Sequence, residues 1–326
     1  MIRTWLTDRF NLAVPVVGAP MVGPGEGRLA AAVSTAGALG MFGVGGSRQG
    51  SWIREQAAIA AGNTPLGATL SAQKRTRPYG IGLMAWVLDQ DDSQLATVLE
   101  LRPSLVSVSF GNFEPHVQRL AGAGIQVTVQ VGNVEEALCA EEAGVDFIVA
   151  RGAEAGGHGR NEIATLPLLQ AVLEAVKVPV VAAGGITTSR GLAAVLAAGA
   201  AGAWVGTALL TALEAANSPQ ARARLIAAGH GQTVYGRVFD VAQRFGWPPE
   251  YGGRSIRNLF YDHWHDRLDE LAHDETAAKQ LTAASEIEDY DFAYLYAGQG
   301  VGSLTKEQPA ADILAELAHA EQLLQH

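Results

Sequence analysis

The sequence predicts an α/β protein, a closed (β/α)8 TIM barrel with a mostly helical C-terminal extension. Three observations lead to this prediction. Short β-branched segments alternate eight times with helical segments rich in Ala, Leu and Glu between residues 14 and 207. The β-branched segments are continuously apolar, as in parallel strands that are covered on both faces. Nearly every helical segment ends at a glycine or just before a proline, which are typical helix stops.

Each expected strand is a short apolar run, and each expected helix is the amphipathic run behind it. Gly37 stops the first helix and Pro103 ends the third. The strands are expected at residues 14–21, 38–44, 65–70, 105–111, 125–132, 145–152, 178–185 and 201–207. The helices are expected at residues 27–37, 51–62, 92–103, 114–124, 134–144, 166–176 and 189–199.

Eight strand–helix units favour a closed barrel over a doubly wound open sheet. The open sheet usually needs fewer strands, and no G-x-G-x-x-G follows the first strand. We expect the barrel to span residues 1–212. An aromatic and helical extension over the barrel mouth is expected at 213–300, and a C-terminal helix that packs on the barrel at 301–326.

The composition excludes several classes of protein. Hydrophobic residues make up 48% and charged residues 17%, and the net charge is −10, which argues against nucleic-acid binding. No apolar run is long enough for a membrane helix, and the segment "MIRTWLTDRF" lacks the apolar core of a signal peptide. The single cysteine, Cys139, occupies an apolar helical position where we expect burial, and it suits a reducing cytoplasm. A homo-oligomer is compatible with the sequence.

The loops behind the last two strands have the composition of a phosphate site. Gly184 and Gly185 follow the seventh strand, and the next helix begins near Thr188, so its positive end points to the same place. Gly206 and Thr207 follow the eighth strand. In barrels these two loops commonly bind phosphate. The alternative interpretation is that the glycines only make tight turns.

The sixth strand ends in "EAGGHGR", residues 154–160, which places His158 at the barrel mouth. No lysine ends this strand, as a Schiff-base aldolase would need, and no metal-ligand spacing is present. FMN, which carries a phosphate, therefore agrees better with these loops than a Schiff-base aldolase or a metal site does. The segment "GAPM" is expected to form an apolar bed for the flavin ring, through Ala19, Pro20 and Met21. His158 would then lie on the reacting side of the ring.

These segments resemble the nitronate monooxygenases, FMN-dependent (β/α)8 barrels related to the flavin enoyl-acyl-carrier-protein reductases. The similarity spans about residues 10–305 and rests on "GAPM", "EAGGH", "PVVAAGGI", "GLAAVLAAGAAGAWVGT" and "YAGQGVG". It implies that His158 is the histidine beside the flavin, acting as a base or holding the nitro group. It also implies cofactor contacts at Pro20, Met21, Gly156, Gly185, Trp204, Val205, Gly206 and Thr207. Gly157 and Gly184 are further expected cofactor contacts in the same loops.

The chain departs from the family pattern near the flavin. Arg151-Gly152 replaces the usual Gln-Gly, and Gly159-Arg160 follows the histidine. Thr69 stands where the family commonly has Asn, and Gln130 where some members have Lys. Thr69, Gln130 and Arg151 are counted here among the cofactor contacts. We hypothesise that Arg151 places a positive charge beside the flavin and stabilises its reduced, anionic form.

The resemblance implies oxidation of alkyl nitronates by O2 to a carbonyl compound and nitrite, with no metal. Two alternatives stay open, which are a flavin-dependent enoyl-thioester or other NAD(P)H reductase, and a non-catalytic FMN-binding protein. His158 itself has a structural alternative, in which it only caps a loop. Most aromatic residues of the extension are expected to pack rather than to shape a pocket, and these are Trp247, Tyr251, Phe260, Tyr261 and Trp264.

Overall fold

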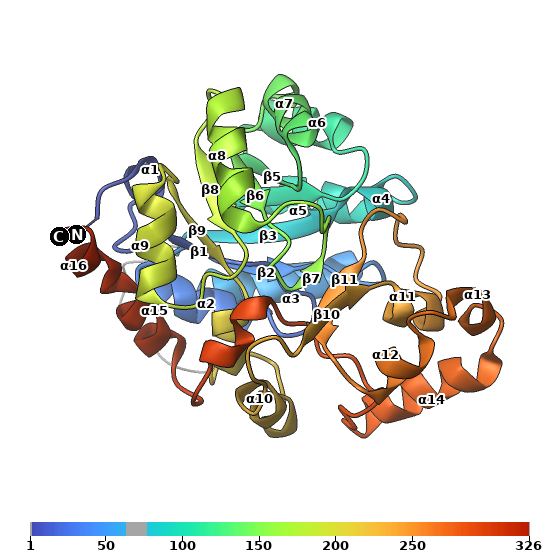
Figure 1. Cartoon of the computed structure of the whole chain (residues 1–326). Helices are drawn as coiled ribbons and strands as arrows, with labels where there is room; N and C mark the ends of the chain where they lie inside the picture. The colour runs from blue at the N-terminus through green and yellow to red at the C-terminus, as the bar shows by residue number, and fades with distance from the viewer. Residues whose placement is uncertain (1, 63–76, 326) are drawn as a thin grey trace.

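In the computed structural model, which describes residues 2–62 and 77–325, eight parallel strands form a barrel (Figure 1). The strand order is β1-β9-β8-β6-β5-β4-β3-β2. The barrel closes between β1 and β2, where Val17 bridges Leu39 and the Gly18 amide donates to the Leu39 carbonyl at 2.9 Å. The strands are β1 (Val16–Gly18), β2 (Gly40–Gly43), β3 (Tyr79–Met84), β4 (Leu105–Ser109), β5 (Val127–Val131), β6 (Phe147–Arg151), β8 (Val180–Ala183) and β9 (Gly202–Val205). The predicted barrel is confirmed.

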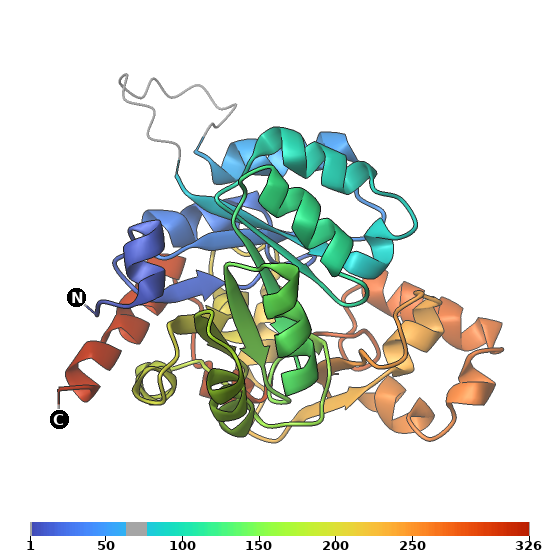
Figure 2. The ribbon, with the colours of Figure 1, turned by 90° about the horizontal axis from the view of Figure 1, so that it is seen from above.

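The helices between the strands form the outer layer, as Figure 2 shows from above. Asn133 and Thr188 cap two of them by accepting a hydrogen bond from a first-turn amide. The helices that were predicted from the sequence are α2 (Gly27–Thr35), α3 (Gly50–Ala60), α5 (Ser93–Leu101), α6 (Glu114–Gly122), α7 (Val134–Ala143), α8 (Thr165–Ala175) and α9 (Ser189–Ala197). Cys139 is exposed on α7, whose buried face carries Ala137 and Ala140, so its predicted burial is wrong.

The third strand of the barrel is β3, which was not predicted from the sequence. The predicted third strand at 65–70 lies outside the described residues. The segment "YGIGLM" has a weak strand signal, because glycine is depleted in strands. Both glycines make room for neighbours, since a Cβ on Gly80 would lie 2.7 Å from the Met41 side chain and one on Gly82 would lie 2.5 Å from Pro20. Packing between neighbouring strands therefore explains the composition that concealed this strand.

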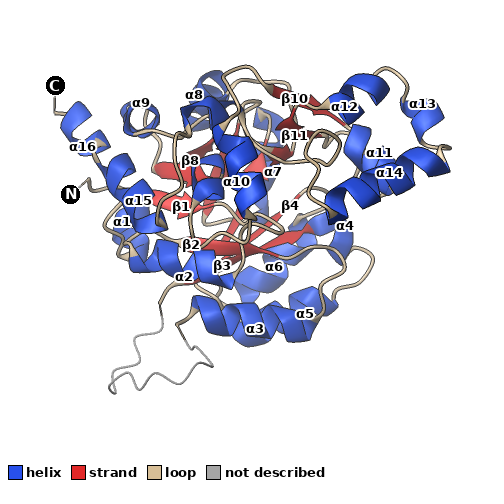
Figure 3. Ribbon diagram, turned by 90° about the horizontal axis from the view of Figure 1, so that it is seen from below, coloured by secondary structure: helices blue, strands red, loops and turns tan. Residues whose placement is uncertain are grey.

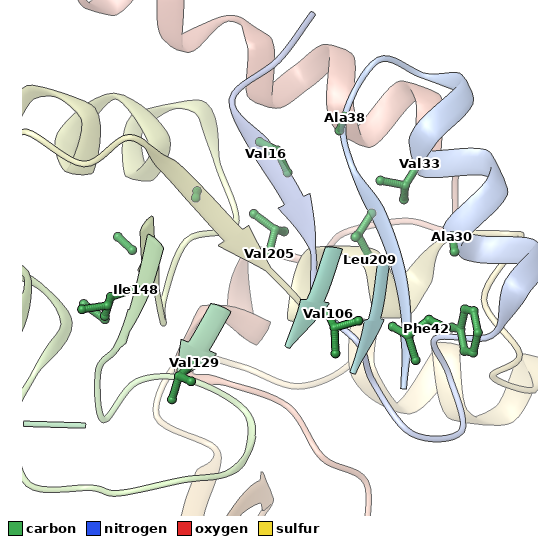
Figure 4. Packing of buried hydrophobic residues seen from close by; sticks show 14 of the residues in the cluster. Val16, Ala30, Val33, Ala38, Phe42, Val106, Val129, Ile148, Val205 and Leu209 are labelled. Carbon is green, nitrogen blue, oxygen red and sulfur yellow. The ribbon is translucent and has the colours of Figure 1, made fainter. Parts of the chain in front are cut away.

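Two layers of apolar side chains use alternate residues of the strands. One layer lies between strands and helices and contains Val16, Phe42, Val106 and Ile148 (Figure 4). The other layer lies inside the barrel and consists of Leu6, Leu12, Val17, Leu39, Met41, Leu105, Phe147, Val149, Val181, Ala183 and Trp204. Leu6 belongs to α1 (Trp5–Phe10), so this helix closes the barrel from the N-terminal side. The open end is therefore the end where the strands terminate.

The C-terminal extension is mostly helical, as predicted, and it lies at one side of the barrel (Figure 3). Its own core contains Phe239, Phe260, Trp264 and Leu281. It begins after η1 (Thr207–Thr211), and its elements are α10 (Pro219–Ile226), β10 (Thr233–Gly236), α11 (Val238–Gln243), β11 (Gly253–Ile256), α12 (Leu259–Trp264), α13 (Leu268–Leu271), α14 (Glu275–Glu286) and η2 (Gln299–Ser303).

The extension leaves the barrel and rejoins it at one place. The Leu213 amide donates to the Gln308 carbonyl at 3.1 Å, beside a bridge between Ala212 and Gln308. The chain then continues into α15 (Ala310–Ala318) and α16 (Ala320–Leu323), which pack on α2 and α9 of the barrel wall.

Replacing Gly40 by Ala tests the packing of α2 on β2. The new Cβ would overlap the Ala30 carbonyl, so we expect the free energy of unfolding to fall by about 3 kcal/mol. Gly122→Ala is the matched control, because nothing lies within 4 Å of its Cβ position, and we expect a change below about 1 kcal/mol. Urea unfolding measures both values, and equal stability of the two variants would contradict the packing described here.

Candidate functional site

The loop "EAGGHGR" at the open end of the barrel is partly a β-strand. Its β7 (Gly157–His158) pairs antiparallel with β11, with His158 opposite Gly253 and Gly157 opposite Arg254. Gly157 and Gly159 have φ values of 70° and 153°, a region that other residues rarely adopt. The glycines therefore allow the path of the loop, and the extension fixes the backbone of His158.

The side chain of His158 has two close partners, and both come from the extension. Its Nε2 lies 2.7 Å from Oδ1 of Asp240 on α11, and the two side chains are 11% and 2% exposed. Its imidazole ring is parallel to the indole of Trp247, with 3.8 Å between centroids and an interplanar angle of 2°. His158 is thus both hydrogen-bonded and covered.

Asp240 has a second hydrogen-bond donor in Tyr296, whose ring centroid lies 5.1 Å from that of His158. Burial, and then the charge of Asp240, raise the pKa of Tyr296 well above its ordinary value. Tyr296 therefore stays protonated and donates to the carboxylate. Asp240 and Tyr296 were not predicted as site residues, although Tyr296 begins the segment "YAGQGVG" that contributes to the family resemblance. Nothing in the local sequence marks Asp240.

Arg151, at the end of β6, forms hydrogen bonds with the backbone of the loop. It is 5% exposed, and its guanidinium donates to the carbonyl oxygens of Gly156 and Gly157, both at 3.0 Å, and to those of Ala155 and Arg160. Burial lowers the pKa of Arg151 to about 10, so the group is still charged at neutral pH. Within the described part of the chain, no carboxylate forms an ion pair with it.

Arg254 of β11 also forms hydrogen bonds with this loop. Its Nε donates to the Ala153 carbonyl at 2.8 Å, and its Nη2 donates to Oδ1 of Asn161 at 2.6 Å. The loop that carries His158 is therefore fixed by two buried guanidinium groups, one from the barrel and one from the extension.

The two predicted phosphate loops meet a third glycine-rich segment. Gly184 and Gly185 have φ values of 116° and 69°, and Thr188 caps α9 directly behind them. The hydroxyl of Thr207 accepts a hydrogen bond from the Gly298 amide at 2.9 Å. A Cβ on Gly300 would lie 2.5 Å from Thr187, which shows how closely the segments approach. Backbone amides of the barrel and the extension thus converge beside the N-terminus of α9.

The other predicted cofactor contacts differ in where their side chains lie. Ala19, Pro20 and Met21 follow β1 at the open end, and Met21 Sδ lies 3.5 Å from the Cβ position of Gly206. The side chains of Trp204 and Val205 are buried in the inner and outer core, so only their backbone is available to a ligand.

Gln130 and Thr69 are the two remaining predicted contacts. Gln130 is half-buried on β5, and its amide donates to the Ser109 hydroxyl at 2.9 Å. Thr69 lies outside the described residues.

Aromatic residues of the extension divide into two groups. Phe260, Tyr261 and Trp264 pack in the core of the extension, in agreement with the expected packing. Trp247 and Tyr251 instead reach the barrel, where each lies with its ring centroid 5.4 Å from that of Phe110 at the end of β4. The described residues contain no group of three His, Cys, Asp or Glu side chains that could hold a metal ion, and none of their helices is long and apolar enough to cross a membrane.

Replacing Arg151 by Met tests whether its guanidinium orders the loop. Because half-buried carbonyls would lose their donor, we expect the free energy of unfolding to fall by about 2 kcal/mol. Hydrogen exchange should rise selectively at residues 155–159. Arg54→Met is the control, since Arg54 forms an exposed pair with Glu100, and it should alter neither quantity. Unchanged exchange in the Arg151 variant would refute the ordering role.

Comparison with known proteins assigns the family. The profile described as nitronate monooxygenase matches residues 3–320. A nitronate monooxygenase of Pseudomonas aeruginosa is 33% identical, with 96% of this chain and 98% of the relative covered. The solved nitroalkane oxidase of Streptomyces ansochromogenes is 30% identical, with a TM-score of 0.80 and coverage of 98% and 99%. FabK from Thermotoga maritima is 25% identical, with a TM-score of 0.84 and coverage of 100% and 98%. The chain therefore belongs to the nitronate monooxygenase family and is an oxidoreductase.

Proposed function

We propose that the protein uses FMN and O2 to oxidise alkyl nitronates to a carbonyl compound and nitrite, and that it also accepts nitroalkanes. The observation that carries this proposal is His158, which lies at the open end of the barrel with its Nε2 on the buried carboxylate of Asp240. The family membership of the chain and the similarity to a nitroalkane oxidase support it.

The residues present fit FMN. Gly185 is exposed, its φ is 69°, and its Cβ position has only Glu154 nearby, at 3.5 Å, so the backbone leaves space for an anion. The nine-residue α9 directs its N-terminus to the same place. Gly206, Thr207 and the 298–300 segment would complete a phosphate cradle. Ala19, Pro20 and Met21 would bed the ring.

FMN, when bound, would supply the redox chemistry that couples substrate oxidation to O2. The protein positions His158, excludes water and supplies charge at the mouth. The loop of residues 154–160 holds His158 at the mouth, and the burial of the site under Trp247 keeps water from one face of the imidazole. A positive charge on Arg151 lies under the loop and favours anions at the mouth.

Asp240 determines which nitrogen of His158 acts. An ionised carboxylate only accepts hydrogen bonds, so Nε2 carries its hydrogen toward Asp240. Nδ1 of the neutral ring then has a free lone pair, which takes the α-proton of a nitroalkane. The resulting imidazolium is stabilised by Asp240, and it holds the nitronate anion by charge.

Wild-type protein that is purified with its natural cofactor tests the proposal directly. We expect a yellow flavin spectrum, release of FMN on denaturation, and nitrite production from ethyl nitronate with uptake of O2. NADPH should reduce the flavin slowly. Fast reduction by NADPH without nitrite production would favour the reductase, and an oxidised flavin after anaerobic mixing with ethyl nitronate would favour a non-catalytic FMN-binding protein.

The role of Asp240 is tested by comparing two substrates of the same enzyme. Asp240→Asn should lower kcat/KM for nitroethane at least about tenfold more than kcat/KM for ethyl nitronate, because only nitroethane must lose a proton. His158→Asn should lower nitroethane turnover by about 10²-fold or more. Asp262→Asn, which removes an exposed partner of Arg257, is the control and should leave both values unchanged. Equal losses for the two substrates would contradict proton transfer by this pair.

A further inference from the structure

We infer that Trp247 is the specificity-determining residue of the site, which limits the size of the substituent on the reacting carbon. This inference rests on the proposed function, since it concerns the nitronate that His158 binds. The indole lies flat on one face of the imidazole, at 3.8 Å and 2°. The indole therefore fills the space beside that face of His158, and a larger ligand group would collide with it.

Trp247 belongs to an aromatic wall that spans the open end of the barrel. Its ring centroid lies 5.4 Å from that of Trp86, on α4 (Ala85–Leu88) directly behind β3, and 5.4 Å from that of Phe110 behind β4. The ring centroid of Tyr251 also lies 5.4 Å from that of Phe110. In Figure 1 the loop between α11 and β11, which carries Trp247, reaches toward α4.

The wall is held in place at several points. Phe110 adopts a left-handed backbone with φ of 69°, a conformation that costs of order 1 kcal/mol for a bulky residue and is kept only where its surroundings impose it. Its carbonyl accepts a hydrogen bond from the Trp86 amide at 3.0 Å. The hydroxyl of Tyr251 donates to Glu136 at 3.3 Å, and Pro248 and Pro249 follow Trp247 directly. A fixed wall excludes large groups, whereas a mobile one would adapt to them.

One polar atom of the wall has no partner. The indole Nε1 of Trp86 is buried, and no acceptor lies on it among the residues that the structure describes. A buried donor without an acceptor is unfavourable, and such groups are often completed by a ligand or a water. The wall itself is aromatic and apolar, which suits the short alkyl group of a nitro compound or its nitronate.

The test is a comparison of substrate size in Trp247→Ala and Trp247→Phe, with Trp52→Phe as the control. Trp52 lies on α3, contacts Phe42 and Arg48, and belongs to the outer core rather than the mouth. We expect the ratio of kcat/KM for phenylmethyl nitronate to that for ethyl nitronate to rise at least about tenfold in Trp247→Ala and less in Trp247→Phe. The control should keep the wild-type ratio.

A binding experiment separates this inference from the proposed function. Acetate and benzoate are planar anions that differ in substituent size, and calorimetry measures their Kd in the purified protein without turnover. Trp247→Ala should tighten benzoate relative to acetate at least about tenfold. Wild-type protein that does not oxidise ethyl nitronate refutes the proposed function alone, and an unchanged benzoate-to-acetate ratio in folded Trp247→Ala protein overturns the role of Trp247 in either case.

Discussion

The burial of the Arg151 guanidinium under the loop at 153–160 is the constraint on which the site depends. A buried cation without a carboxylate partner is unfavourable, and here carbonyl oxygens of the loop compensate for the lost water. The carbonyls can all accept hydrogen bonds from the guanidinium only if the loop keeps a single conformation. The pairing of β7 with β11 and the position of His158 follow from that conformation.

Arg151 and the residues that follow His158 fit together sterically. A Cβ on residue 159 would overlap the guanidinium of Arg151, so Gly159 leaves the space that the arginine needs. Arg160 pairs with Glu136 at 2.6 Å and lies over the ring of Tyr251. The arginine before the loop and the two residues after the histidine are therefore coupled through direct contacts. The contacts of Arg151 with the loop backbone give its charge a structural task beside the electrostatic one hypothesised from the sequence.

The sequence was most informative where structure is local. The alternation of apolar runs and helices, with glycine and proline stops, was enough for the barrel and for His158 at its mouth. It did not predict β3, because Gly80 and Gly82 are required by close contacts with Met41 and Pro20 on neighbouring segments. It also failed at Asp240, which lies 82 residues from His158 in the chain. No local pattern encodes that contact, because it exists only when the extension has folded against the barrel.

The point where the extension leaves and rejoins the barrel has a consequence for how such enzymes diverge. Leu213 and Gln308 are hydrogen-bonded neighbours, so the whole intervening segment is inserted into the barrel through one narrow connection. Segments with adjacent ends are replaced or remodelled with little disturbance of the host fold. Since Asp240, Trp247 and Arg254 all lie in this insert, natural variation can exchange the chemical environment of the histidine as a unit, while the barrel that presents it is inherited unchanged.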